Sequence, residues 1–163
     1  MPFPIFFGDV FDMKQRTKYW TPSSLVLAVT GVLLILVGVY FVFLRPPLLP
    51  EDIRYMAISA TELGNFRPNL ELWLTQVFRV MGGYVSATGA LMVTLAATAF
   101  RTRQNGAALG VVTGGIASIG LMATVNFVIN SDFRWALLGI ALLWACSILL
   151  FWFETKASTN HGG

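Results

Sequence analysis

Four long apolar runs, each free of charged residues, constrain this sequence more than any other feature. Each run is about 20 residues long, which is the length that an α-helix needs to cross a hydrocarbon core of roughly 30 Å. Because backbone groups cannot stay unpaired in lipid, each run is predicted to be a helix. We therefore expect an all-α fold, a transmembrane four-helix bundle, with helices at about 25–44, 72–100, 107–130 and 133–153.

The composition supports a membrane protein. Charged residues make up 12% of the chain and hydrophobic residues 56%, whereas a soluble domain carries roughly 25% charged residues. The net charge of +3 is small, and the sequence has no long basic patch interleaved with aromatic residues of the kind that binds nucleic acid. We expect membrane lipids, and no nucleic acid, among the partners of this chain.

The charges between the runs predict the topology. Lys14, Arg16 and Lys18 directly precede the first run, and a basic cluster at this place favours a cytoplasmic N-terminus. Four spans return the C-terminus to the same side. We expect a cytoplasmic N-terminal arm at 1–23, a transmembrane domain at 24–154 and a cytoplasmic tail at 155–163.

The connection between the first two runs is long and carries a pattern of its own. The prolines of RPPLLP are expected to end the first helix. The residues that follow begin with two acids and continue with apolar residues spaced along one helical face. We predict a short amphipathic helix at about 51–63, lying at the membrane interface.

Polar residues gather at the outer ends of the predicted helices. Counted back from Arg101, Arg79 falls at the outer membrane boundary, where its long side chain can reach water. Three interpretations stay open: a boundary anchor, an ion pair that clamps the long loop onto the bundle, or part of a small polar pocket for a headgroup or quinone ring. The predicted outer polar ring consists of Arg79, Glu62, Glu71, Asn126, Asn130, Asp132 and Arg134.

Small residues recur every three or four positions on two of the predicted helices. Such strips allow close approach of two backbones and favour helix association in lipid. We expect them to pack within one bundle, with contact to another subunit as the alternative. The strip residues are Gly82, Gly83, Ser86 and Gly89 on the second helix, and Gly106, Gly110, Gly114 and Ser118 on the third.

The sequence offers little for catalysis or metal binding. Its one cysteine, Cys146, lies in an apolar run, and its one histidine, His161, lies in the polar tail. An internal disulfide and a protein-ligated metal site are therefore not expected. No run buries an ionisable group away from its ends, as ion-coupled transporters normally do. We predict no catalytic residue, no metal and no cofactor, and a bound lipid or quinone stays compatible with the pattern.

Three segments resemble a group of bacterial four-helix integral membrane proteins with no assigned activity: PPLLPEDIRYMAIS, LWLTQVFRVMGGYVSATGALM and GGIASIGLMATVNFVINSDFRW. The resemblance covers roughly residues 45 to 144. It supports the four-span topology and implies no substrate, cofactor or catalytic residue. Together with the basic cluster before the first run, four spans lead us to expect a multi-pass protein of the bacterial inner membrane with both termini cytoplasmic.

The N-terminal arm lies outside this resemblance and is too apolar for a free tail. We expect contact with a partner or with the membrane from Phe3, Ile5, Phe6, Phe7 and Phe11. The first expected function is that of a non-catalytic accessory subunit, packed against a larger inner-membrane assembly. The alternative is a stand-alone binder or carrier of a lipid, quinone or other hydrophobic ligand.

Overall fold

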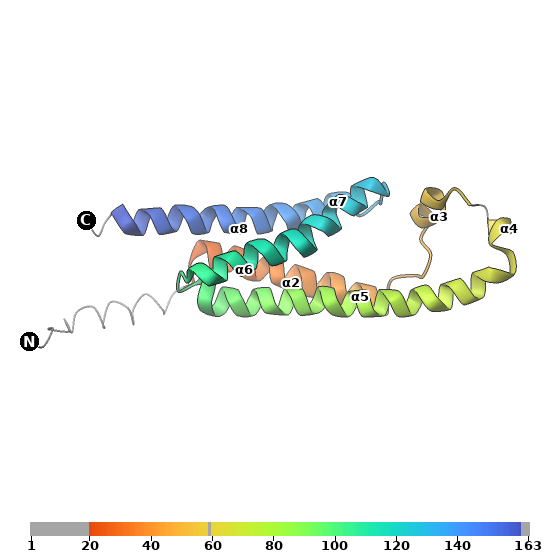
Figure 1. Cartoon of the computed structure of the whole chain (residues 1–163), viewed down its shortest axis with the longest axis horizontal. Helices are drawn as coiled ribbons and strands as arrows, with labels where there is room; N and C mark the ends of the chain where they lie inside the picture. The colour runs from red at the N-terminus through yellow and green to blue at the C-terminus, as the bar shows by residue number, and fades with distance from the viewer. Residues whose placement is uncertain (1–19, 59, 161–163) are drawn as a thin grey trace, which may run out of the picture.

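The computed structural model describes residues 20–58 and 60–160, so most of the predicted N-terminal arm, including its five apolar contact residues, and His161 lie outside the described residues. All regular secondary structure in the described residues is helical. Four of the helices are long and apolar enough to cross a membrane: Pro22–Phe43, Gly64–Phe100, Gly106–Val128 and Arg134–Ala157. They lie side by side, as Figure 1 shows.

The first long helix, α2 (Pro22–Phe43), has clear start and stop signals. Thr21 is its N-cap, Pro22 occupies the first turn, and the side chains of Thr21 and Ser24 form a capping box. The helix ends just before Arg45, because the two prolines that follow cannot continue it.

The connection after α2 contains two short helices where one was predicted. α3 (Pro50–Met56) ends because Ala57 adopts a left-handed conformation with φ 53°. α4 (Ala60–Leu63) and a 3₁₀ turn, Gly64–Phe66, then lead into the next long helix. The predicted helix at about 51–63 is therefore wrong as a single element, because the apolar spacing carries no signal for a left-handed alanine.

The second long helix, α5 (Arg67–Leu95), continues through a π-helical segment at Ala96–Phe100. It begins five residues before the predicted start at 72, because Pro68 is tolerated in the first turn of a helix. At 1.5 Å per residue, the 37-residue helical stretch from Gly64 to Phe100 is longer than a hydrocarbon core of roughly 30 Å. In Figure 1, α5 accordingly projects beyond the end of α2 toward α4.

The third long helix is interrupted and the fourth is continuous. α6 (Asn105–Gly115) passes through a π-helical segment, Ile116–Gly120, into α7 (Leu121–Val128). α8 (Arg134–Asn160) runs beyond the predicted end at 153, so the tail is helical up to residue 160. We call the end of the molecule near α3 and α4 the loop end, and the opposite end, where the first and last described residues lie, the terminal end.

α2 and α5 form the tightest pair in the described structure. A Cβ added to Gly82 would lie 2.6 Å from the carbonyl oxygen of Gly38, and one added to Gly89 would lie 2.5 Å from that of Gly31. The two backbones are therefore in direct contact at two levels, as small residues permit. Ser86, between these levels, lies against Gly38. α2 also packs against α8, and α7 packs mainly against α8.

A close contact between the third and fourth helices lies where the third helix becomes π-helical. A Cβ on Gly115 would lie 2.1 Å from Nε1 of Trp144, and this indole donates a hydrogen bond of 3.1 Å to the carbonyl of Val111. The π-helical segment begins at the next residue. α6 lies near α5 at the terminal end, whereas α7 lies near α8 at the loop end (Figure 1).

The terminal end is held by a polar cluster around Glu154. Its carboxylate accepts hydrogen bonds from the backbone and hydroxyl of Ser23, at 3.1 and 2.7 Å, and forms an ion pair with Arg103. Arg103 also donates to the carbonyl of Phe151 at 3.1 Å. The cluster joins the start of α2, the α5–α6 turn and the last turns of α8.

Candidate functional site

The divergence of α7 from α5 leaves a pocket in the loop-end half of the molecule. Its volume is about 800 Å³, and all four long helices and the α2–α3 connection contribute to its wall. The wall is mainly apolar. Representative lining residues are Leu34 and Val37 from α2, Met81 and Val85 from α5, Leu121 and Met122 from α7, and Phe133 and Ile140 near and on α8.

One side of the pocket is closed by Arg45, which follows α2. Its guanidinium donates to a carboxylate oxygen of Asp52 at 3.0 Å and to the carbonyl of Pro46 at 3.0 Å. It also lies over the ring of Phe78, 3.6 Å from the ring centre, in a cation–π arrangement. Only 8% of the Arg45 side chain is exposed, so the loop is fastened to α2 and α5 at this point.

Glu51, the neighbour of Asp52 on α3, is a buried acid that also lines the pocket. The residue is 3% exposed, and its carboxylate accepts a hydrogen bond of 3.4 Å from Oγ of Ser131. Oγ of Ser131 accepts in turn from the backbone amide of Phe133 at 3.2 Å. Within residues 20–58 and 60–160, this long hydrogen bond is the one that the buried carboxylate accepts.

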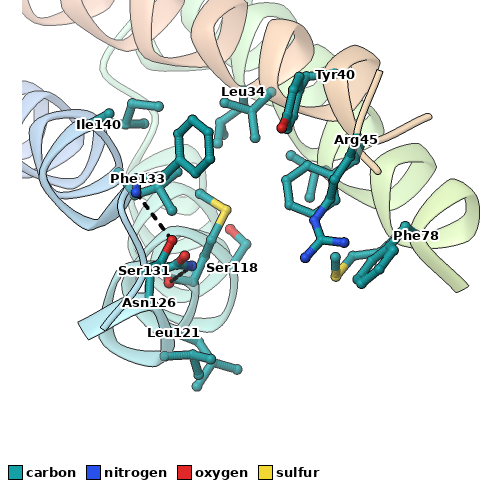
Figure 2. Close-up of a pocket in the computed structure, with 18 of the residues that line it drawn as sticks. Leu34, Tyr40, Arg45, Phe78, Ser118, Leu121, Asn126, Ser131, Phe133 and Ile140 are labelled. Carbon is teal, nitrogen blue, oxygen red and sulfur yellow. Dashed lines mark hydrogen bonds between the residues drawn. The ribbon is translucent and has the colours of Figure 1, made fainter. Parts of the chain in front are cut away.

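Figure 2 shows how these polar groups are distributed. Arg45 and Phe78 lie on one side of the pocket, and Asn126, Ser131 and Phe133 lie on the other. The amide of Asn126 donates to the carbonyl of Met122 within its own helix, at 2.9 Å. The space between the two sides is lined mainly by apolar side chains, with the hydroxyl-bearing Tyr40 and Ser118 among them. The site therefore combines an apolar chamber with a few polar groups, the usual character of a small-molecule pocket.

The residues of the predicted outer polar ring are near the loop end but do not form one ring. The guanidinium of Arg79 donates to the side chain of Gln76 at 3.5 Å, whereas Glu71 pairs with Arg67 at 2.7 Å. Asp132 lies 3.9 Å from Arg54. Of the seven predicted residues only Asn126 lines the pocket. Asn130 is the hydrogen-bond partner of Arg134, and Glu62 is exposed on α4.

Arg79 itself can now be placed. Gly82, less than one turn further along α5, lies against Phe41 and Val42, which are in the last turn of α2. Arg79 is therefore exposed at the level where α2 ends, the position that suits a boundary anchor.

Four further residues belong to the site and are not among those that the sequence predicts: Arg45, Glu51, Asp52 and Ser131. The available signal was a basic residue at the end of an apolar run, followed across a proline-rich turn by two acids. That pattern was interpreted as the end of one helix and the charged first turn of the next.

The two predicted strips of small residues have different surroundings. Gly82, Ser86 and Gly89 face α2, and their partners are Gly31 and Gly38. A Cβ on Gly83 would meet no atom of the described residues within 4 Å, and the same is true of Gly106, Gly110 and Gly114. Ser118 lines the pocket, and its hydroxyl donates to the carbonyl of Gly114 at 2.6 Å.

Comparisons with protein families, with curated proteins and with solved structures found no match to this chain. Among residues 20–58 and 60–160, no group of three or more histidine, cysteine or acidic residues is arranged to hold a metal. The four long apolar helices are those of a multi-pass membrane protein.

Proposed function

We propose that this chain is a non-catalytic membrane protein that binds a lipid, quinone or other amphipathic hydrophobic molecule in the loop-end pocket. The pocket of about 800 Å³ carries this proposal, because cavities of roughly 300–1,000 Å³ with apolar walls and few polar groups are typical of ligand sites. Ligand binding was the alternative expectation from the sequence, and the pocket favours it over the accessory subunit.

In this proposal the four long helices form a bundle across a bacterial inner membrane. The outward side chains of α2 support immersion in lipid, since Leu25, Val29 and Val32 form an exposed apolar stripe. α3 then lies at the interface, and Arg45 and Glu51 lie at headgroup depth. An amphipathic ligand would place its polar end there and its hydrocarbon between α5 and α7.

Filling the pocket tests the proposal. Ala117 is exposed and lines the pocket, whereas Ala87 is exposed on α5 and does not line it. We expect Ala117→Phe to reduce the lipid or quinone retained by the detergent-purified protein in native mass spectrometry. Ala87→Phe adds the same bulk outside the pocket and should leave retention unchanged. Equal retention by both variants and the wild type would count against the proposed function.

A second candidate is the accessory subunit. The observation that favours it is the open face of α6, where a Cβ on Gly106, Gly110 or Gly114 would meet no described atom within 4 Å. Such a face can receive a helix of another protein. Gly110→Leu should then reduce the size of the assembly on a mild-detergent native gel, whereas Gly139→Leu, at an isolated open glycine of α8, should not.

A further inference from the structure

The charged residues of the pocket indicate what kind of polar group it would accept. Among the residues that the structure describes, three charged side chains line it, Arg45, Glu51 and Asp52. Their formal charges leave one negative charge in a site with mainly apolar walls. Charges in such surroundings interact more strongly than in water. A ligand with a positive group therefore complements the pocket, and a ligand with a net negative headgroup does not.

Arg45 is already engaged within the protein. One terminal nitrogen of its guanidinium is bonded to Asp52, the other contacts the carbonyl of Pro46, and the plane lies over Phe78. The same oxygen of Asp52 accepts a second hydrogen bond, of 2.9 Å, from the backbone amide of Leu49. The Arg45–Asp52 pair is thus satisfied within the protein and holds the α2–α3 connection in place.

Glu51 is the acid that remains. A carboxylate has about four lone-pair positions for hydrogen bonds. Among the described residues, Glu51 accepts one bond, of 3.4 Å, from Ser131, and water has little access because only 3% of the residue is exposed. A buried charge is costly unless a partner with hydrogen-bond donors compensates it. The partner that fits is a cation that carries N–H groups.

We infer that the pocket selects a membrane lipid whose headgroup ends in a primary ammonium, with the ammonium at Glu51 and an acyl chain in the apolar chamber. This inference rests on the proposed function and names the ligand class of the same site. Phosphatidylethanolamine is the common membrane lipid of this chemistry, because its ammonium offers three donors to a carboxylate. Phosphatidylcholine has the same charges without N–H groups, and a quinone ring offers carbonyl acceptors that a carboxylate cannot bond.

The experiment is a competition in detergent, read by native mass spectrometry of the full-length protein. The probes are dioleoyl phosphatidylethanolamine, dioleoyl phosphatidylcholine, dioleoyl phosphatidylglycerol and decylubiquinone. Hydrogen bonds to charged groups carry enough free energy for a preference of about tenfold. We expect the wild type to prefer the ethanolamine lipid over the choline lipid by about that factor. Glu51→Gln keeps the shape and removes the charge, and should reduce the preference to about twofold or less.

Glu71→Gln is the matched control, because Glu71 is at the same end of the molecule, pairs with Arg67 and does not line the pocket. It should keep the wild-type preference. Equal binding of the two zwitterionic lipids by the wild type overturns the inference, as does tighter binding of phosphatidylglycerol or decylubiquinone. The wild-type comparison decides this even if Glu51→Gln does not fold. If the probes bind without a preference and Ala117→Phe abolishes their binding, the proposed function stands and the inference fails. If Ala117→Phe leaves the binding of every probe unchanged, the proposed function and the inference are both contradicted.

Discussion

Adjacent glycines on α5 show how much the environment of one residue depends on a rotation of 100° around a helix. Gly82 is buried against α2, where an added Cβ would lie 2.6 Å from the oxygen of Gly38 and 2.8 Å from Cγ2 of Val42. Gly83 is exposed and would meet nothing within 4 Å among the described atoms. The two residues have the same intrinsic propensity, so any difference between their substitutions reports packing.

We predict that Gly82→Ala destabilises the protein and that Gly83→Ala does not. Forcing a methyl group into a close backbone contact typically costs about 1–3 kcal/mol, whereas replacing an open helical glycine with alanine gains about 0.5–1 kcal/mol in helix propensity. Thermal unfolding in detergent should show a lower midpoint for Gly82→Ala and an unchanged or higher one for Gly83→Ala. Equal midpoints for the two variants would mean that α2 and α5 do not touch at this level.

The candidate site could be predicted only in part, because sequence spacing does not specify the ion-pair and hydrogen-bond partners of long side chains. Asn126 was placed at the loop end and does line the pocket. The charges of the predicted ring, however, have separate partners: Glu71 pairs with Arg67 one turn away, whereas Asp132 lies near Arg54 of α3. Arg45 and Glu51 escaped notice because burial, rather than residue type, makes them unusual.

At the scale of the element, hydropathy located the four long helices but not their ends. A polar first or last turn carries no hydropathy signal, so the start of α5 at Arg67 and the extension of α8 to Asn160 were missed. The apolar runs were informative because lipid requires every backbone group to be paired within the helix. The break at Ala57 followed from a backbone conformation that alanine rarely adopts.

The start of α2 and the end of α8 depend on each other through Glu154. Its carboxylate bonds the backbone amide and the hydroxyl of Ser23 and pairs with Arg103. We predict that Glu154→Ala costs about 1–3 kcal/mol, the range for removing a partner of charged hydrogen bonds. Glu71→Ala is the matched control, since the Glu71–Arg67 pair is more exposed and such helix pairs contribute only about 0.3–0.5 kcal/mol.

Chemical denaturation in detergent can compare these two variants. A loss for Glu154→Ala no larger than that for Glu71→Ala would show that the terminal-end cluster adds no more than a surface pair. The cluster would then have no part in holding the three segments together.

At the scale of the whole molecule, the pocket depends on how one helix leans relative to the others. α6 begins beside α5, and after the contact of Gly115 with Trp144 the π-helical segment leads into α7 beside α8. The volume between α5 and α7 follows from this oblique course of the third helix. Sequence periodicity describes which face of a helix is apolar, and it carries no signal for the tilt of one helix relative to its neighbours.

The arrangement of the helices makes a prediction about sidedness. Four spans place both termini on one side and the α3–α4 segment on the other, and the basic residues Lys14, Arg16 and Lys18 favour a cytoplasmic N-terminus. Single cysteines can report this in a Cys146→Ser background. Asn65, at the loop end, and Gln104, in the α5–α6 turn, are both exposed. We expect an impermeant maleimide to label Asn65→Cys in intact cells and Gln104→Cys only after the membrane is opened.

Two labelling results would contradict this prediction, and they have different meanings. Labelling of Gln104→Cys alone in intact cells would reverse the orientation and place Glu51 in the cytoplasmic leaflet, while the four spans would stand. Labelling of both positions in intact cells would mean that no membrane separates them. The first result would change which leaflet supplies the ethanolamine lipid, and the second would contradict the bundle on which the pocket depends.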